Sequence, residues 1–294
     1  MKTIAYDKIK LYNSVVCLGK FQGLHRGHML LIDKTLKLAK DEELNSVIFT
    51  INTSNTNRIY TDNEREILLS NMGFDYNVTS EFSKEFAAMS PRQFVWDILV
   101  NRLGVRYVVV GADFRFGSER KGDVTLLTEL GKEYGFSVIA IDKLSVDGIV
   151  VSSSYIRELI EDGIMHSITD YMGRPYSISG IVKKGKQLGR QIGFPTVNIY
   201  PDGQKLVPLH GVYASHIYIG SEKYRGITNI GSNPTVNNTD EIFVETNILD
   251  YDGDLYGQNI TVYLDYFVRT EMKYNNIDEL KTQIGRDKEF VMHQ

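Results

Sequence analysis

The sequence predicts an α/β domain with a parallel sheet, followed by a six-stranded antiparallel β-barrel with a terminal helix. The chain has 294 residues, a length that favours two domains. Through residue 172, short apolar runs alternate with helical patterns, as in βαβ units. After Gly173-Arg174-Pro175, apolar and polar residues alternate in short runs separated by turn sequences, which is typical of an antiparallel barrel. We therefore expect one domain over residues 1–172 and a second over 173–294.

Four apolar runs predict the strands of the first domain, at residues 14–18, 47–51, 107–111 and 137–141. Helical patterns cover residues 28–40, 63–72 and 154–171. Another helix begins at Ser90-Pro91, because proline is well tolerated in the first turn of a helix. Ligands of parallel sheets bind at the carboxyl ends of the strands, so the loops that follow these strands are expected to carry a site.

The second domain shows the two-residue period of half-buried strands. Ile260, Val262 and Leu264 alternate with polar residues, and Val244 and Thr246 belong to another such run. Asp-Gly, Gly-Ser and Asn-Pro pairs mark the turns. We count about six strands, and then a helix from residue 277 to the C-terminus.

The composition excludes several classes of protein. The net charge is −4, so affinity for a phosphate backbone is not expected and no nucleic-acid partner is predicted. No run approaches 18 apolar residues, and the opening residues lack the apolar core of a signal peptide. The single Cys17 cannot form an internal disulfide. We expect a cytoplasmic protein without a membrane partner, either a monomer or a weak oligomer.

A glycine- and histidine-containing loop, residues 19–28, follows the first strand and opens the first helix. A helix N-terminus attracts anions, and His25 and His28 would add donors to a polyphosphate. The spacing matches neither of the common glycine-rich nucleotide fingerprints. A simple turn with two surface histidines is the alternative interpretation.

His25-Arg26-Gly27-His28 resembles the His-x-Gly-His signature of the nucleotidyltransferase superfamily. Ser152-Ser153-Ser154-Tyr155-Ile156-Arg157 resembles its second signature, although an ordinary capped helix has the same residues. The resemblance implies a Rossmann-like domain with catalytic His25, His28 and Arg157. It also implies nucleotide contacts from Gly19, Phe21, Gly23, Gly27, Ser153 and Ser154.

Residues 111–123 follow another strand and combine two phenylalanines with arginines, a lysine and glycines. Such a loop suits an anionic ligand that carries a ring, and a charged surface loop is the alternative. The segment resembles a stretch of the prokaryotic bifunctional riboflavin kinase/FMN adenylyltransferases, also called FAD synthetases. The resemblance implies flavin contacts from Asp113, Phe114, Phe116, Arg120 and Asp123.

A basic, glycine-rich segment, residues 183–198, is the first candidate functional segment of the second domain. Thr196 and Asn198 are two apart, so on a strand their oxygens face one side and suit Mg²⁺. A basic hairpin is the alternative. Gly193-Phe194-Pro195-Thr196-Val197-Asn198 resembles the riboflavin kinase signature, in which the threonine and asparagine serve Mg-ATP. The resemblance places Gly185, Gly189, Arg190, Gly193 and Pro195 at the nucleotide.

Glu245 lies on a strand that is otherwise rich in apolar residues. The resemblance makes it the general base that accepts a proton from the substrate hydroxyl, whereas a lone glutamate is more commonly a solvated strand residue. It also places Arg269 and Tyr274 at the flavin. The implied substrates are riboflavin, FMN and ATP, with Mg²⁺, and FAD is the final product.

The sequence departs from the family mainly in its first half. Lys20 and Gln22 stand where the family has Asn and Asp, and residues 50–55 replace a Phe-x-Pro-His-Pro-like stretch. In the second half, Asn247 replaces a usual His beside Glu245. The main prediction is a bifunctional enzyme of flavin-cofactor biosynthesis. A riboflavin kinase with a weakened adenylyltransferase, and a non-catalytic flavin-binding regulator, are the alternatives.

Overall fold

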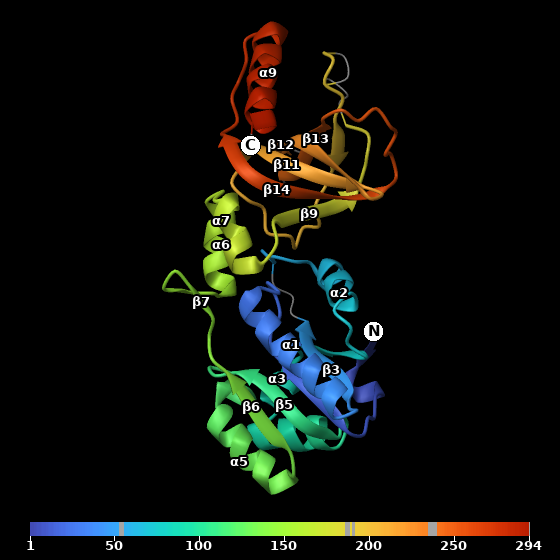
Figure 1. Ribbon diagram of the computed structural model, residues 1–294, viewed down its shortest axis with the longest axis vertical. Coiled ribbons are helices and arrows are strands. Elements are labelled where there is room, and N and C mark those ends of the chain that lie inside the picture. Colours follow the sequence, from blue (N-terminus) through green and yellow to red (C-terminus); the bar gives the residue numbers. More distant parts are fainter. Residues whose placement is uncertain (53–55, 186–188, 190–191, 235–239, 294) are drawn as a thin grey trace. The chain divides into compact units, whose positions relative to one another are not determined.

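The computed structural model describes residues 1–293, except for 53–55, 186–188, 190–191 and 235–239 (Figure 1). The chain divides into two compact units. The first comprises residues 1–55 and 62–153, and the second comprises residues 56–61 and 154–294. None of the helices in the described part of the chain has the length and apolar character needed to span a bilayer.

The first unit is built on a parallel sheet of six strands in the order β1-β4-β3-β2-β5-β6. These are β1 (Lys2–Ala5), β2 (Ser14–Leu18), β3 (Asn45–Asn52), β4 (Tyr76–Glu81), β5 (Val105–Gly111) and β6 (Ser137–Ile141). The predicted α/β class is confirmed, and the four predicted strands correspond to β2, β3, β5 and β6. The edge strand β1 and its neighbour β4 were not predicted, because neither has a continuous apolar run.

Strand β2 lies between β3 and β5, so the chain leaves it in one direction and later returns on its other side. The loop that follows β2 therefore opens at the point where the strand order reverses, the usual ligand position in such sheets.

Helices connect the parallel strands of the first unit. They are α1 (Arg26–Asp41), α2 (Asp62–Ser70), α3 (Lys84–Ala88), α4 (Pro91–Gln93), the π-helix η2 (Phe94–Val100) and α5 (Val124–Tyr134). Short 3-10 turns η1 (Tyr6–Lys8) and η3 (Ser118–Arg120), and a small hairpin of β7 (Ser145–Val146) and β8 (Ile149–Val150), complete the unit.

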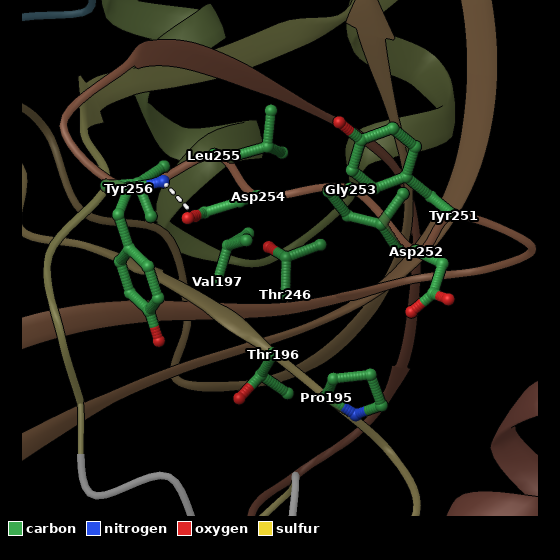
Figure 2. Close-up of a pocket in the computed structure, with 12 residues that line it drawn as sticks. Pro195, Thr196, Val197, Thr246, Tyr251, Asp252, Gly253, Asp254, Leu255 and Tyr256 are labelled. Carbon is green, nitrogen blue, oxygen red and sulfur yellow. Dashed lines mark hydrogen bonds between the residues drawn. The ribbon is translucent and has the colours of Figure 1, made fainter.

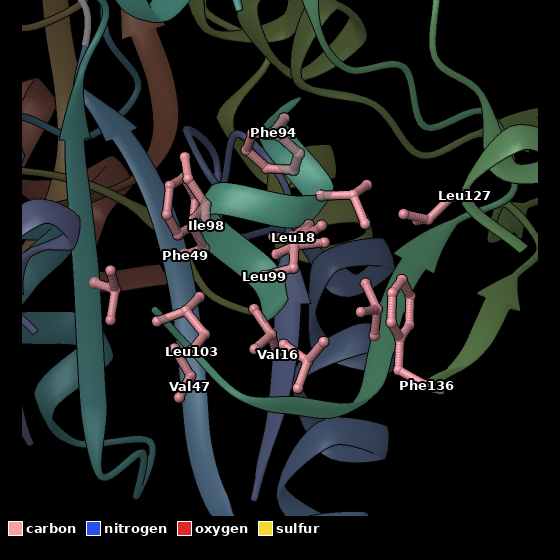
Figure 3. Close-up of a cluster of buried hydrophobic side chains, with 14 of the residues drawn as sticks. Val16, Leu18, Val47, Phe49, Phe94, Ile98, Leu99, Leu103, Leu127 and Phe136 are labelled. Carbon is pink, nitrogen blue, oxygen red and sulfur yellow. The ribbon is translucent and has the colours of Figure 1, made fainter. Parts of the chain in front are cut away.

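The core of the first unit lies between the sheet and η2 (Figure 3). Ile98 and Leu99 of η2 pack in one buried cluster with Val16, Leu18 and Phe49 of the central strands. Cys17 alternates with Val16 and Leu18, so it faces the other side, toward α1. Complete burial raises the pKa of the Cys17 thiol to about 12, although a hydrogen bond with Thr35 of α1 opposes this change.

The second unit begins with two helices, α6 (Ser153–Glu161) and α7 (Met165–Met172). The prediction of one continuous helix over 154–171 is wrong. Gly163 has φ +73°, a left-handed conformation that ends α6 and redirects the chain.

An antiparallel sheet of six strands follows, in the order β10-β13-β12-β11-β14-β9. The strands are β9 (Tyr176–Ile181), β10 (Val197–Ile199), β11 (Gly211–Ile219), β12 (Glu222–Pro234), β13 (Asp240–Ile248) and β14 (Asn259–Arg269). Its two edges approach each other, since the Lys183 amide donates to the Asn198 carbonyl at 2.8 Å and a Cβ on Gly180 would lie 3.1 Å from the Ile199 Cβ. The predicted six-stranded barrel is confirmed.

The terminal helix α9 (Ile277–His293) is fixed to the barrel by two arginines. Arg225 Nη1 donates to the carbonyls of Val291 and Met292 at 3.1 and 2.7 Å, and it thereby satisfies the last turn of the helix. Arg269 pairs with Asp287 in the middle of the helix. The predicted C-terminal helix is confirmed.

The segment 56–61 belongs to the second unit although it lies between β3 and α2 in the sequence. The Arg58 amide donates to the Gln204 carbonyl, and the Leu206 amide donates to the Arg58 carbonyl, both at 2.8 Å. Buried Lys205 donates to the Ile59 carbonyl and lies over the Tyr60 and Tyr176 rings, at 5.0 and 4.7 Å. Local sequence patterns do not indicate that residues 56–61 pack with the second unit.

Candidate active site

The register of the second sheet places five side chains in one row across five strands. Asn198 of β10 lies opposite Glu245 of β13, and Glu245 lies opposite Asn229 of β12. Asn229 lies opposite Val212 of β11, which pairs in turn with Arg269 of β14. Directly opposite residues project from the same face of a sheet. Glu245 is therefore flanked by two amide side chains.

Glu245 is also held from the edge of the sheet. The hydroxyl of Thr196, which immediately precedes β10, donates to Glu245 Oε1 at 2.6 Å. Both residues are half-buried, and Asn198 is buried with 8% exposure. This hydrogen bond fixes one carboxylate oxygen, and the other oxygen remains to accept a proton.

A cavity of about 210 Å³ lies along this row. It is lined by Glu245, Asn229, Asn247, Val212, Arg269, Tyr274 and apolar residues that include Ile192, Phe194, Leu280 and Ile284. Two of its polar atoms, Asn229 Oδ1 and Tyr274 Oη, are buried and have no hydrogen-bond partner among the described residues. Buried polar atoms of this kind are usually satisfied by a ligand or an ordered water.

A second cavity, of about 340 Å³, is lined by Pro195, Thr196, Val197, Thr246 and the loop 251–256 (Figure 2). The Tyr256 amide donates to Asp254 Oδ1 at 2.9 Å and folds this loop. The ammonium of Lys184 lies 6.0 Å from the centre of the Tyr256 ring. The aromatic rings and polar groups of the loop line a pocket of a size and character suited to a polar ring, and the Lys184 cation lies nearby.

Strand β13 separates the two cavities. Glu245 and Asn247 line the smaller cavity, whereas Thr246 and Ile248 line the larger one, because successive strand residues face opposite sides. Thr196 alone among the described residues lines both. Two ligands would therefore meet at Thr196, beside Glu245.

Glycines shape the predicted nucleotide loop. A side chain at Gly185 would overlap the Asn198 amide, and one at Gly189 would overlap the Phe194 carbonyl. Gly189 and Phe194 are also joined by a backbone hydrogen bond of 2.8 Å. Gly193 has φ +89°. Predicted nucleotide contact Arg190 lies outside the described residues.

Arg269 and Tyr274, which the resemblance places at the flavin, line the smaller cavity. The Arg269 guanidinium binds the Asp287 carboxylate through three hydrogen bonds of 2.7 to 3.2 Å. Burial disfavours the charged guanidinium, but Asp287 outweighs this effect and holds the pKa of Arg269 above its usual value. Burial raises the pKa of Tyr274.

In the first unit, His25 and His28 lie at the start of α1. His25 is its N-cap, and Nδ1 of His25 accepts a hydrogen bond from the His28 amide at 3.3 Å. The two imidazoles are stacked with their centres 3.7 Å apart, and His25 is only 7% exposed. The structure brings these two predicted residues together at the helix N-terminus, where an anion is stabilised.

The surrounding loop supports the histidines. A side chain at Gly19 would lie 2.9 Å from the Phe21 ring, and one at Gly27 would lie 3.2 Å from the His25 ring. Phe21 is completely buried and packs 5.2 Å from His28. Gly23 is buried as well. The Phe21 side chain therefore supports the loop, and any nucleotide contact at this position would come from its backbone.

The stretch 113–123 divides into buried and exposed parts. Phe116 is buried and stacks with Phe114 at 5.7 Å, and Asp123 caps α5 by accepting the Leu126 amide at 2.9 Å. A hydrogen bond with Lys143 holds the pKa of Asp113 below its usual value. Exposed Arg120 has φ +57°. Among the predicted flavin contacts, only Phe116 is buried; Asp113, Phe114, Arg120 and Asp123 are partly or fully exposed.

Ser153 ends the first unit, and Ser154 and Arg157 belong to the second. All three lie in the first turns of α6. Arg157 Nε donates to the Asn57 carbonyl of the segment 56–61 at 3.3 Å. The first signature therefore belongs to the first unit, whereas the second signature is divided between the two units.

Comparison with known proteins identifies the family. Residues 172–294 match the riboflavin kinase family, and residues 7–155 match the FAD synthetase family. The bifunctional riboflavin kinase/FMN adenylyltransferase of Escherichia coli K12 is 35% identical over 283 residues, which cover 93% of this chain and 90% of that protein. This chain belongs to the bifunctional riboflavin kinase/FMN adenylyltransferase family. The Bacillus subtilis member is 32% identical over 289 residues, which cover 94% of this chain and 90% of that protein.

A solved structure supports the same architecture. The crystal structure of a macrolide-efflux protein from Streptococcus pneumoniae has a TM-score of 0.89 and 30% identity, with 99% of both chains covered. The similarity covers both units of this chain.

In the kinase half, the structure places at the cavities residues to which the sequence motifs gave no role. Asn229 and the loop 251–256 line the cavities, but only strand register and tertiary packing bring them there. Asn247, identified as a departure from the family, donates to the Pro195 carbonyl at 2.6 Å. Asp287 was not predicted either, because a carboxylate on an amphipathic helix looks like a solvent-exposed residue.

Proposed function

We propose that this chain makes both flavin cofactors: its second unit phosphorylates riboflavin with ATP, and its first unit carries the FMN adenylyltransferase. Membership of the bifunctional family supports both activities. The observation that carries the kinase assignment is the Thr196–Glu245 hydrogen bond between two cavities that open on opposite faces of β13. The smaller cavity, with Arg269 and Tyr274, would take riboflavin, and the larger would take ATP.

In the kinase step, the terminal hydroxyl of the ribityl chain attacks the γ-phosphorus of ATP. A new O–P bond forms, the bond from the γ-phosphorus to the bridging oxygen breaks, and ADP leaves. Glu245 accepts the hydroxyl proton, while Thr196 keeps the carboxylate in place. The two cavities orient the reactants, which is the main contribution expected of a phosphotransferase.

Mg²⁺ would bind with ATP beside Thr196 and Asn198. The Thr196 hydroxyl donates a hydrogen bond to Glu245, so its oxygen lone pairs remain to contact a hard cation. No cluster of three His, Cys, Asp or Glu side chains that could hold a metal occurs among the described residues. A neutral donor set suits an ion that arrives with the nucleotide and neutralises phosphate charge.

In the adenylyl transfer, a phosphate oxygen of FMN attacks the α-phosphorus of ATP and pyrophosphate leaves. His25 and His28 at the N-terminus of α1 would stabilise the negative charge on the phosphates. The family resemblance also assigns Arg157, Ser153 and Ser154 of α6 to the nucleotide. The accessible Asp113, Phe114, Arg120 and Asp123 would contact FMN.

A second candidate is a riboflavin kinase whose adenylyltransferase is weak. Lys20 and Gln22 depart from the family. They flank buried Phe21, whose ring packs against His28. Reverting both, as Lys20→Asn with Gln22→Asp, should strongly raise FAD synthesis if these residues limit it. The paired Thr196 and Glu245 disfavour a non-catalytic flavin-binding regulator.

The deciding experiment is a chromatographic product assay with purified full-length protein, ATP and Mg²⁺. Riboflavin is the starting flavin in one reaction and FMN in the other. FAD from both reactions would support the bifunctional proposal. FMN from riboflavin, with no FAD from added FMN, would favour the second candidate. Flavin binding without turnover of either substrate would contradict both and favour a regulator.

A further inference from the structure

Asn229 lines the kinase cavity, but the proposed reaction gives it no role. Its Oδ1 atom is buried and accepts no hydrogen bond from the described chain. A buried carbonyl oxygen without a donor costs about 1–3 kcal/mol. The atom lines the cavity that would take the flavin, so a ligand hydroxyl or amide can supply the missing donor.

The position of Asn229 beside the base narrows the choice of donor. Asn229 and Glu245 are directly opposite in the β12–β13 register, with side chains on one face. The Cβ atoms of such pairs are roughly 4.5–5.5 Å apart. An alcohol that gives its proton to Glu245 therefore places the next carbon of its chain near Asn229.

We propose that Asn229 is a specificity residue that accepts a hydrogen bond from the secondary hydroxyl next to the hydroxyl that is phosphorylated. The kinase site would thus recognise a terminal vicinal diol, with the primary hydroxyl at Glu245 and its neighbour at Asn229. The proposal rests on the kinase activity proposed above. It adds that the site recognises the secondary hydroxyl next to the reacting one.

An amide suits this role better than a carboxylate. Asn229 supplies a neutral acceptor, whereas an aspartate would place a second negative charge beside Glu245 and raise the pKa of the base. On its other side Glu245 has another amide, Asn198. Glu245 is therefore the one negatively charged residue among these three neighbours.

Tyr274 provides an internal comparison. Its hydroxyl is the other buried atom of this cavity without a described partner, but it comes from the chain between β14 and α9 and not from the row beside Glu245. Its loss should weaken flavin binding without changing the preference for a diol.

The test is a substrate-by-variant comparison on the full chain. Kinase kcat/KM is measured with riboflavin and with 4′-deoxyriboflavin, which lacks only the secondary hydroxyl beside the reacting carbinol. The natural chain should prefer riboflavin by about 10–100-fold, the range expected for one buried hydrogen bond. Asn229→Ala should lose most of this preference, because riboflavin suffers and the analogue does not. Tyr274→Phe should affect the two substrates equally.

Two controls separate specificity from folding. Asn259→Ala removes an exposed asparagine from β14 and should leave both substrates unaffected. Asn229→Asp preserves size and acceptor oxygen, so it should keep the preference for riboflavin and move the kcat/KM pH profile to higher pH.

Three results would overturn the proposal: equal losses on both substrates in Asn229→Ala, no discrimination by the natural chain, or an unmoved pH profile in Asn229→Asp. A natural chain that phosphorylates neither flavin would instead reject the kinase function itself, and this proposal with it.

Discussion

The hydroxyl of Thr196 donates a hydrogen bond to Oε1 of Glu245 at 2.6 Å, across the β10–β13 edge of the barrel. The pair lies where the two cavities of the second unit approach each other. The bond orients the carboxylate and leaves its second oxygen for a substrate proton. A residue of the predicted metal-nucleotide site and the predicted base are thus parts of one local arrangement.

Replacing the base by its amide tests its role directly. Glu245→Gln keeps the size of the side chain but cannot accept a proton, so kinase turnover should fall by about 10²–10⁴-fold. ATP binding, measured by calorimetry, should change little. Glu241→Gln, at an exposed position of the same strand, should be close to normal. Near-normal turnover in Glu245→Gln would remove the residue from the mechanism.

Asn247 should act by positioning the loop that precedes β10. Its amide donates to the Pro195 carbonyl at 2.6 Å, next to Thr196. Asn247→Ala removes this bond and should lower kinase kcat/KM by up to about 100-fold, as a small misplacement of reacting groups can. Asn247→His keeps an N–H donor and should recover most of the activity. If both variants behave alike, the hydrogen bond does not position the loop.

The Arg269–Asp287 pair should hold α9 to the barrel. Asp287 is 3% exposed, so Arg269→Met leaves a buried carboxylate without its cation, at a cost of about 3–5 kcal/mol. Hydrogen exchange of α9 amides should accelerate markedly. The double variant Arg269→Met, Asp287→Leu should be protected better than the single one, because no unpaired charge remains. Equal exchange in both variants would contradict this account.

Cys17 should make the first unit sensitive to alkali. The unfolded thiol ionises near its ordinary pKa of 9.0, whereas burial delays ionisation in the folded chain to about pH 12. The unfolded state then binds fewer protons, so stability falls as pH rises above 9.0, by up to about 1.4 kcal/mol per unit. Urea unfolding between pH 8 and 10.5 should show this loss in the natural chain and not in Cys17→Ala. Rapid thiol labelling of the folded chain would contradict the burial.

The two activities should respond separately to a change at α1. His28→Ala removes one of the stacked imidazoles at the helix N-terminus and should impair FAD formation from FMN. FMN formation from riboflavin should be spared, because the Thr196–Glu245 arrangement belongs to the second unit. His293→Ala, near the end of α9, serves as a matched control. An equal loss of both products would show that the sites are not independent.

Local sequence patterns predicted the two kinds of domain, the four central parallel strands and the terminal helix. They succeeded because apolar periodicity and turn residues are short-range signals. They failed at β1 and β4, which have no continuous apolar run, and at Gly163, whose left-handed backbone divides one predicted helix into two. Residues 56–61 belong to the second unit because they contact Lys205, which is far from them in the sequence.

By itself, the sequence determined which chemical groups this protein has: imidazoles at a helix N-terminus, a threonine and an asparagine two apart, and a carboxylate on an apolar strand. Tertiary structure alone decided which of them meet. The register of β10, β13 and β12 places Asn198 and Asn229 on either side of Glu245. Register is fixed by packing and hydrogen bonding between strands that are remote in the chain, and a shift of one residue would turn Glu245 to the other cavity.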